Sequence, residues 1–260
     1  AGQVYSWDEV FGVLELMKEK GLEPDVYSYN CVMNVCAKTT RTATTRRPVH
    51  LEWGWDRGLE VLAHMKDNGV QPDVVTYTAL LDTCLNSLRA AGDDESVRHG
   101  RSVLDMMRED GIEPNTVSYT SLINAAKLQG SPRAVQLGYE TFLEMRPETR
   151  NLRTYTVMIG AFARVGRAED AWAVFCDAKK MLAPDTILYS AIMGAVASDR
   201  KLVLQLHDEM KEAGCVDDDV VLWQIKQAKG YTGPRGGASR IGDGFRTNPT
   251  GGYEPKWKRS

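Results

Sequence analysis

GIEPNTVSYTSLINA, residues 111–125, contains both the end of one predicted helix and the start of the next. Gly111 can adopt the left-handed conformation that closes a helix, and Pro114 cannot continue one. Asn115 or Thr116 can then cap a new helix. After these residues the apolar side chains recur at a spacing of mostly three and four, which is typical of an amphipathic helix. The segment is therefore predicted to join two helices.

The same segment recurs along the chain. Fuller copies begin at Gly21 and Gly69, and weaker copies begin at Asn151 and Leu182. The tyrosines that align between the copies are Tyr29, Tyr77, Tyr119, Tyr155 and Tyr189, separated by 48, 42, 36 and 34 residues. Self-similarity at a period of tens of residues is typical of repeat architectures. We expect the repeated tyrosine to pack between helices.

A second kind of segment, with a single apolar stripe, lies between one copy and the next. Its instances are residues 7–20, 55–68, 97–110, 134–145, 168–180 and 201–213. Each unit is then a pair of helices that cannot bury its apolar face alone, and stacking of neighbouring pairs buries that face. The sequence therefore predicts an all-α fold, an α-solenoid of stacked helical hairpins with an extended C-terminal tail.

The repeat register divides the chain into four parts. These are a partial first repeat at 1–25, five repeats at 26–218 with insertions near 39–54 and 88–96, a partial repeat at 219–230 that caps the solenoid, and a tail at 231–260. The first insertion is rich in Thr and Arg and is predicted to be a mobile loop, while the second is short and acidic. The tail combines many Gly and Pro residues with spaced aromatic and basic ones, so we do not expect a packed domain there. No strands are expected in the chain.

Composition and charge narrow the function classes. The chain has 260 residues, 43% of them hydrophobic and 26% charged, and no segment approaches a membrane span. The tail carries six Lys/Arg and two Asp/Glu, so the first 230 residues carry 26 and 33, a formal charge of −7. A simple polycation is thereby excluded. Ala1 falls within a repeat and no signal or transit segment opens the chain, so we expect a processed or truncated chain.

The residue types that carry catalysis or bind metals form no recognisable motif. The cysteines are Cys31, Cys36, Cys84, Cys176 and Cys215, without a Cys-x-x-Cys pair or adjacent His ligands, and we expect buried, reduced thiols. The four histidines occur in unrelated contexts. The acidic run 217–219 suits a helix cap better than a metal site. We therefore expect no catalysis, no metal and no cofactor.

The paired helices, the Gly-x-x-Pro-Asp/Asn ending and the Val-Thr-Tyr-Asn/Thr-like start resemble the pentatricopeptide repeat family over nearly all of residues 1–229. The tetratricopeptide pattern fits less well. The resemblance implies a right-handed superhelix whose first helices line a concave face, on which single-stranded RNA is read one base per repeat. It also implies that the residue after the tyrosine reads the base together with the last residue of the repeat.

The resemblance assigns five reader pairs in this sequence. They are Asn30 with Asp73 for uridine, Thr78 with Asn115 and Thr120 with Asn151 for adenine, Thr156 with Asp185 for guanine, and Ser190 with Asp218 for a purine. The implied RNA tract is 5′-UAAGG-3′. We expect these small polar residues at exposed sites, with solvated surface as the alternative role. Trp223 breaks the pattern in the last, partial repeat.

The resemblance also assigns contacts to the base faces and to phosphates. The side chains that would sandwich the bases are Tyr27, Val75, Val117, Arg153 and Ile187. The late position on each first helix, where phosphate contacts are implied, holds Lys38, Asn86, Leu128, Arg164 and Ser198, of which only Lys38 and Arg164 are basic. We therefore expect modest, salt-sensitive RNA affinity, unless Arg41, Arg46 and Arg47 of the first insertion or the tail contribute.

Three functions are compatible with these residues. The first is a non-enzymatic adaptor of a mitochondrion or chloroplast that binds single-stranded RNA and acts in its stability, processing or translation. The second is a structural subunit of an organellar ribosome or another large complex, which binds protein or ribosomal RNA through the solenoid and the tail. The third is the helical-repeat part of a larger enzyme, similar to the protein-only RNase P family.

Overall fold

The computed structural model describes residues 7–42, 53–87, 95–230, 245–247 and 253–255. Across these residues the chain forms twelve α-helices, one short 3-10 helix and two short strands. Each helix that follows a copy of the recurring segment, called a hinge below, is a first helix. The first helices are α2 (Val26–Thr42), α4 (Val74–Ser87), α6 (Thr116–Gln129), α8 (Leu152–Arg164), α10 (Thr186–Ala195) and α12 (Asp219–Ala228). The second helices are α1 (Trp7–Glu19), α3 (Trp53–Asp67), α5 (Glu95–Glu109), α7 (Pro132–Glu144), α9 (Ala168–Met181) and α11 (Arg200–Glu212). The 3-10 turn η2 (Pro147–Thr149) precedes α8.

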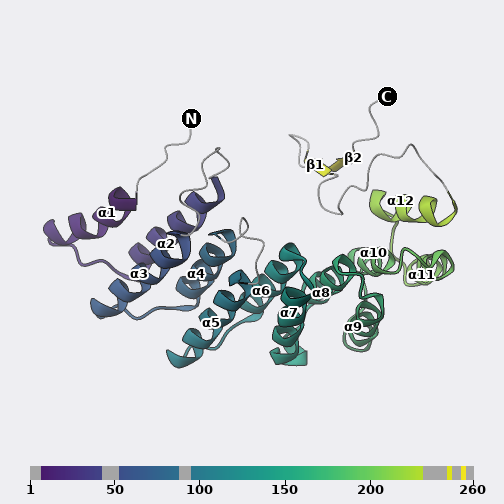
Figure 1. The fold of residues 1–260 in the computed structure, drawn as a ribbon, viewed down its shortest axis with the longest axis horizontal. Helices are drawn as coiled ribbons and strands as arrows, with labels where there is room; N and C mark the ends of the chain where they lie inside the picture. The colour runs from purple at the N-terminus through teal and green to yellow at the C-terminus, as the bar shows by residue number, and fades with distance from the viewer. Residues whose placement is uncertain (1–6, 43–52, 88–94, 231–244, 248–252, 256–260) are drawn as a thin grey trace.

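The helices are arranged in two layers. Consecutive first helices contact one another along the chain, α2 with α4, α4 with α6, α6 with α8, α8 with α10 and α10 with α12. Figure 1 shows the first helices on the inner side of a shallow arc and the second helices on its outer side. The predicted all-α solenoid of helical hairpins is therefore confirmed. In such an array, residues at the same position of successive first helices form a row.

The hinge at residues 111–115 has the predicted geometry. Gly111 has φ 74°, and the N–H of Ile112 donates to the carbonyl of Met107 at 2.8 Å, so the preceding helix ends in a left-handed closing turn. Asn115 has an extended backbone, and its side-chain oxygen accepts from the N–H of Ser118. Asn115 rather than Thr116 is therefore the residue that caps α6.

The repeated tyrosines pack between helices, as predicted. Tyr29, Tyr77 and Tyr155 are fully buried, Tyr189 is nearly so, and Tyr119 is partly buried. Several of their hydroxyls donate to a carboxylate on, or directly after, the second helix of the same hairpin. These bonds join Tyr77 to Asp110, Tyr155 to Asp177 at 3.1 Å and Tyr189 to Glu209 at 2.8 Å. A buried hydroxyl needs such a partner, so the tyrosine also fixes how the two helices of a hairpin meet.

Two sequence expectations about the irregular segments differ from the structure. The strands β1 (Phe245–Thr247) and β2 (Tyr253–Pro255) pair antiparallel, with Arg246 opposite Glu254, although no strands were expected. Phe, Tyr and Thr favour extended backbone, and an oppositely charged cross-strand pair adds to it. The insertion near 39–54 begins inside α2 and ends inside α3, because the helices continue to Thr42 and from Trp53. Residues 43–52 and 88–94 and the rest of the tail lie outside the described residues.

The cysteine thiols differ in how far they are buried. Cys36 is buried, and burial raises the pKa of its thiol to about 12. Cys31 is exposed, so the expectation of a buried thiol is wrong there, while Cys84 falls outside the side chains described. Within the described part of the chain, no three potential ligands gather into a metal-binding group, and no helix is both long and apolar enough to cross a membrane.

Candidate nucleic-acid interface

The second member of each predicted reader pair caps a first helix. Its side-chain oxygen accepts from the backbone N–H three residues later. The bonds run from Thr76 to Asp73 (2.8 Å), Ser118 to Asn115 (3.0 Å), Thr154 to Asn151 (2.9 Å), Leu188 to Asp185 (2.8 Å) and Val221 to Asp218 (2.8 Å). Asp, Asn and Ser are the preferred residues for this position because they satisfy an N–H that has no partner within the helix. These residues therefore have a structural role whether or not RNA binds.

Capping decides which atom of the side chain remains available. In Asn115 and Asn151 the Oδ1 atom is turned toward the helix, so the Nδ2 group is left to donate. In Asp185 and Asp218 one carboxylate oxygen is used in the same way and the other is left to accept. The same place in successive repeats thus offers a hydrogen-bond donor or an acceptor, according to whether the residue is Asn or Asp.

Asp73 carries one more contact than the other caps. Its Oδ1 accepts from Nδ2 of Asn30 at 3.2 Å in addition to the Thr76 N–H, and Oγ1 of Thr76 lies 2.9 Å from the same oxygen. Burial disfavours the charged form, but these hydrogen bonds from Thr76 and Asn30 outweigh it and hold the pKa of Asp73 below its ordinary value. The carboxylate is therefore ionised at neutral pH and its second oxygen is a strong acceptor.

The first member of each reader pair is less exposed than expected. Asn30 and Thr120 are each only 8% exposed, so the expectation of exposed sites is wrong for these two. The reason is contact with the next hairpin, since Asn30 bonds to Thr76 and Asp73, and Thr120 bonds to Thr154. The other three, Thr78, Thr156 and Ser190, are intermediate in exposure.

Thr78 and Thr156 use their hydroxyl protons within their own helices. Thr78 donates to the carbonyl of Val74 at 2.7 Å, and Thr156 donates to the carbonyl of Leu152 at 2.8 Å. A hydroxyl carries one proton and two lone pairs, so both oxygens remain available as acceptors. The pair of Thr78 and Asn115 thus offers one acceptor and one donor. The pair of Thr156 and Asp185 offers two acceptors.

A row of exposed apolar side chains accompanies the polar pairs. The predicted base-sandwich residues Tyr27, Val75, Val117 and Ile187 are 76%, 54%, 57% and 61% exposed, and Arg153 is also exposed. Each is the second residue of its first helix. Flat aromatic bases suit such a row, because a base stacks on an apolar or guanidinium surface and buries it. In α12 the pattern changes, with Leu222 and Trp223 exposed instead.

Two basic side chains from neighbouring first helices lie close together. Arg164 ends α8, and Lys127 lies near the end of α6. Burial and the nearby Arg164 lower the pKa of Lys127, and among the described residues neither side chain pairs with an acid. Gly130 and Gly160 make room for them, because a Cβ on Gly130 would meet Arg164 and one on Gly160 would meet Lys127 at 2.9 Å.

The sequence reasoning missed Lys127, because it placed the late position of α6 at Leu128, which is 41% exposed. The signal available was a basic residue one place earlier, on the helix that precedes Arg164. The predicted phosphate contact Lys38 and the arginines Arg41, Arg46 and Arg47 lie outside the side chains that the structure describes.

The comparison with protein families decides the relationship. The pentatricopeptide repeat domain matches residues 5–39, 60–128 and 102–149, and the PPR repeat matches residues 153–181. The chain belongs to the pentatricopeptide repeat family. The matched residues include Asn30, Asp73, Thr78, Asn115 and Thr120 of the reader pairs. The PPR repeat match also includes Thr156. A comparison with curated protein sequences gives no match.

Solved pentatricopeptide repeat structures share the fold. The maize protein PPR10 is 22% identical with a TM-score of 0.53, over 88% of this chain and 35% of its own. The PPR domain of Arabidopsis thaliana protein-only RNase P 1, solved in complex with tRNA, is 17% identical with a TM-score of 0.54, over 83% of this chain and 97% of that domain. The nuclear proteinaceous RNase P 2 of A. thaliana is 18% identical with a TM-score of 0.55, over 78% and 42%. This chain therefore spans about a third of the maize protein.

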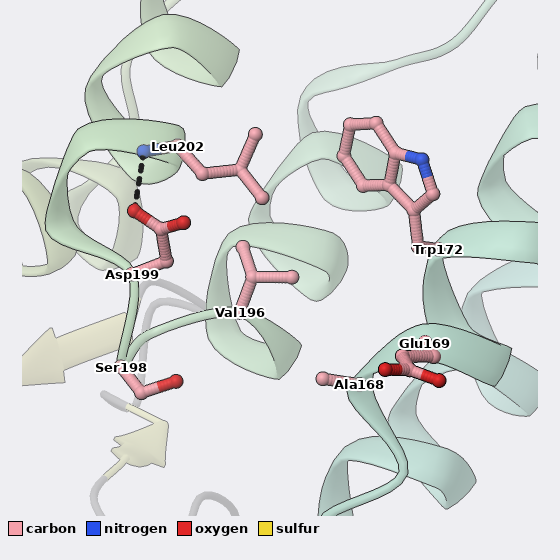
Figure 2. A pocket seen from close by; sticks show the side chains of 7 residues that line it. All are labelled: Ala168, Glu169, Trp172, Val196, Ser198, Asp199 and Leu202. Atoms are coloured by element: carbon pink, nitrogen blue, oxygen red, sulfur yellow. Dashed lines mark hydrogen bonds between the residues drawn. The ribbon is translucent and has the colours of Figure 1, made fainter.

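A separate pocket of about 360 Å³ lies between the starts of α9 and α11 in this pentatricopeptide repeat array. Figure 2 shows Trp172 of α9 across from Leu202 of α11, with Asp199 bonded to the backbone N–H of Leu202 at 3.0 Å. Asp199 is therefore used as a helix cap. None of the predicted reader residues lines this pocket, so it is distinct from the row described above.

Proposed function

We propose that this chain is a non-enzymatic adaptor that binds single-stranded RNA along its first helices, one base to each reader pair. The observation that supports this best is the register of the first helices. In five of them an exposed side chain able to stack lies three residues before a small polar reader. Each reader is paired with the cap of the next first helix, whose free atom is a defined donor or acceptor.

The free atoms match the edges of particular bases. The second oxygen of Asp73 can accept from the N3–H of uracil, and that of Asp185 can accept from the N1–H of guanine. The amide groups of Asn115 and Asn151 can instead donate to N1 of adenine, which has no hydrogen. Each Thr oxygen beside them can accept from an exocyclic amino group. The polarity of the caps thus supports the tract 5′-UAAGG-3′.

The comparisons support RNA as the ligand class at the level of the family. One matched structure is a PPR domain solved in complex with tRNA, and nearly all of that domain is covered. We place the adaptor in a mitochondrion or chloroplast, where it would act in transcript stability, processing or translation. The mechanism is passive, because a protein that occupies a tract blocks nucleases and competing RNA structure. The Lys127–Arg164 pair adds a contact for the phosphate between two bases.

A binding selection tests the proposal directly. The purified chain is incubated at low salt with a random single-stranded RNA pool, and bound sequences are determined after several rounds. We expect enrichment of UAAGG or of a tract that differs from it by one base. Fluorescence anisotropy with the enriched tract and a scrambled control of equal composition then gives the ratio of the two affinities. Enrichment of an unrelated motif, or equal affinity for both RNAs, would refute base reading by these residues.

A further inference from the structure

We infer that Thr76 and Thr154 are positioning residues that fix the hydrogen-bond polarity of the reader on the preceding hairpin, and thereby set its base preference. This inference rests on the proposed function and deepens it. Both threonines are fully buried third residues of their first helices, α4 and α8. The resemblance assigned them no role, and their burial keeps them from touching a base.

Thr76 holds the amide of Asn30 in one orientation. The Thr76 hydroxyl donates to Oδ1 of Asn30 at 2.7 Å, while Nδ2 of Asn30 donates to Oδ1 of Asp73 at 3.2 Å. If the amide turned over, its oxygen would face the Asp73 carboxylate, so two acceptors would meet and the bond to Asp73 would be lost. The remaining N–H and the remaining lone pair of Asn30 are therefore presented to a ligand in a fixed order.

Thr154 makes the Thr120 hydroxyl a hydrogen-bond acceptor toward RNA. Thr154 Oγ1 lies 3.0 Å from Asn151 Oδ1, which can only accept, and 3.0 Å from Thr120 Oγ1. Both contacts are hydrogen bonds only if Thr154 gives its single proton to Asn151 and Thr120 donates to Thr154. Thr120, which is 8% exposed, then has a lone pair left to accept from a ligand. An acceptor at this position favours a base with an exocyclic amino group, such as adenine.

The other repeats lack a hydrogen bond between the third residue of the first helix and the preceding reader, and they provide an internal comparison. Leu188 and Val221 occupy the third position in α10 and α12, and neither side chain can form a hydrogen bond. Ser118 in α6 donates to its own cap, while the reader before it, Thr78, donates to the backbone of its own helix. The link is thus specific to the first and third reader pairs. Base discrimination at those two positions should depend on the buried hydroxyl.

The test uses variants that remove one hydroxyl at nearly constant shape. Thr76→Val and Thr154→Val are compared with Thr76→Ser and Thr154→Ser, which restore the hydroxyl. Thr141→Val is the matched control, because Thr141 is also fully buried and its hydroxyl donates to the carbonyl of Leu137 at 2.9 Å, away from the readers. Dissociation constants are measured for 5′-UAAGG-3′ and for RNAs with each of the other bases at the first or third position.

We expect each valine variant to affect one position only. Thr76→Val should reduce the preference for uridine at the first base about five-fold, and Thr154→Val should do the same for adenine at the third, since each loses one hydrogen bond to its reader. The serine variants and Thr141→Val should retain both preferences. A loss of affinity that is equal for all four bases, or a loss of both preferences together, would show a merely structural role and overturn the inference.

A measurement without RNA separates this inference from the proposed function. In NMR spectra of the free protein, the side-chain amide protons of Asn30 should shift and exchange faster in Thr76→Val, and should be unchanged in Thr141→Val. Unchanged Asn30 signals in Thr76→Val would refute the positioning itself, whatever RNA does. If the wild-type protein shows no base preference while Thr76→Val still shows the expected NMR change, base reading is refuted, and with it the specificity role of Thr76.

Discussion

Gly138 on α7 offers a sharp test of the packing between the two helices of a hairpin. A Cβ at this position would lie 2.7 Å from Cβ of Ala126 on α6, about 1 Å closer than two carbon atoms normally approach. Ala126 is fully buried and has no flexible end that could move away. The substitution Gly138→Ala therefore requires the two helix backbones to separate.

The expected effect follows from two opposing contributions. Replacing Gly by Ala inside a helix stabilises it by about 1 kcal/mol, because Ala loses less backbone entropy on folding. Overpacking of a close contact costs about 1–3 kcal/mol, and the rigid neighbour here places the cost near the upper end. Gly138→Ala should therefore destabilise the protein by about 1–2 kcal/mol. Gly58 and Gly100 should tolerate Ala better, because a Cβ there meets the movable ends of Leu80 and Leu122.

Gly12 provides the matched control for Gly138. It is exposed on α1, with nothing within 4 Å of a Cβ, so Gly12→Ala should stabilise the protein by about 1 kcal/mol. The assay is urea unfolding followed by circular dichroism, with hydrogen exchange of α6 and α7 as the local readout, since repeat arrays can unfold in parts. Adding Ala126→Gly to Gly138→Ala should recover more than Ala126→Gly alone predicts. A Gly138→Ala variant as stable as Gly12→Ala would refute the close-contact reasoning.

Three further predictions concern charge and hydrogen bonding. Asp73→Asn keeps the capping oxygen but turns the free acceptor into a donor. Fluorescence anisotropy should then show that the preferred first base changes from uridine to cytidine, whose N3 accepts. An unchanged preference for uridine would contradict the cap-polarity argument. Lys127→Met should weaken RNA binding and reduce the slope of log affinity against log salt concentration by about 0.7. Lys201→Met on α11 should change neither the affinity nor the slope. Equal slopes for Lys127→Met and the wild-type protein would exclude a phosphate contact by Lys127. Burial and the Asp110 carboxylate raise the pKa of Tyr77 above 10.0. Because the unfolded chain loses this proton first, the Tyr77 contribution to stability is complete below about pH 10 and is lost above it. Between about pH 9 and 11, the urea midpoint of Tyr77→Phe should therefore fall less than that of the wild-type protein. An equal fall in both proteins would count against a stabilising role of the buried Tyr77 hydroxyl.

The sequence determined the elements of this protein because the signals that begin and end its helices are local. The left-handed turn at Gly111 and the cap at Asn115 each depend on a backbone conformation and a side chain within a few residues. The recurrence of this segment with Tyr119 and its counterparts was enough to predict hairpins that stack. The exposed row of Tyr27, Val75 and its counterparts could also be placed by register alone.

Only the tertiary structure decided which side chains of neighbouring hairpins meet. Thr76 contacts Asn30 across 46 positions of sequence, and Lys127 lies beside Arg164, because the rotation of one helix against the next sets these pairs. No local pattern carries that rotation. The sequence accordingly misjudged Asn30 as exposed, whereas the packed array buries it against Asp73 and Thr76 and fixes the direction of its hydrogen bonds.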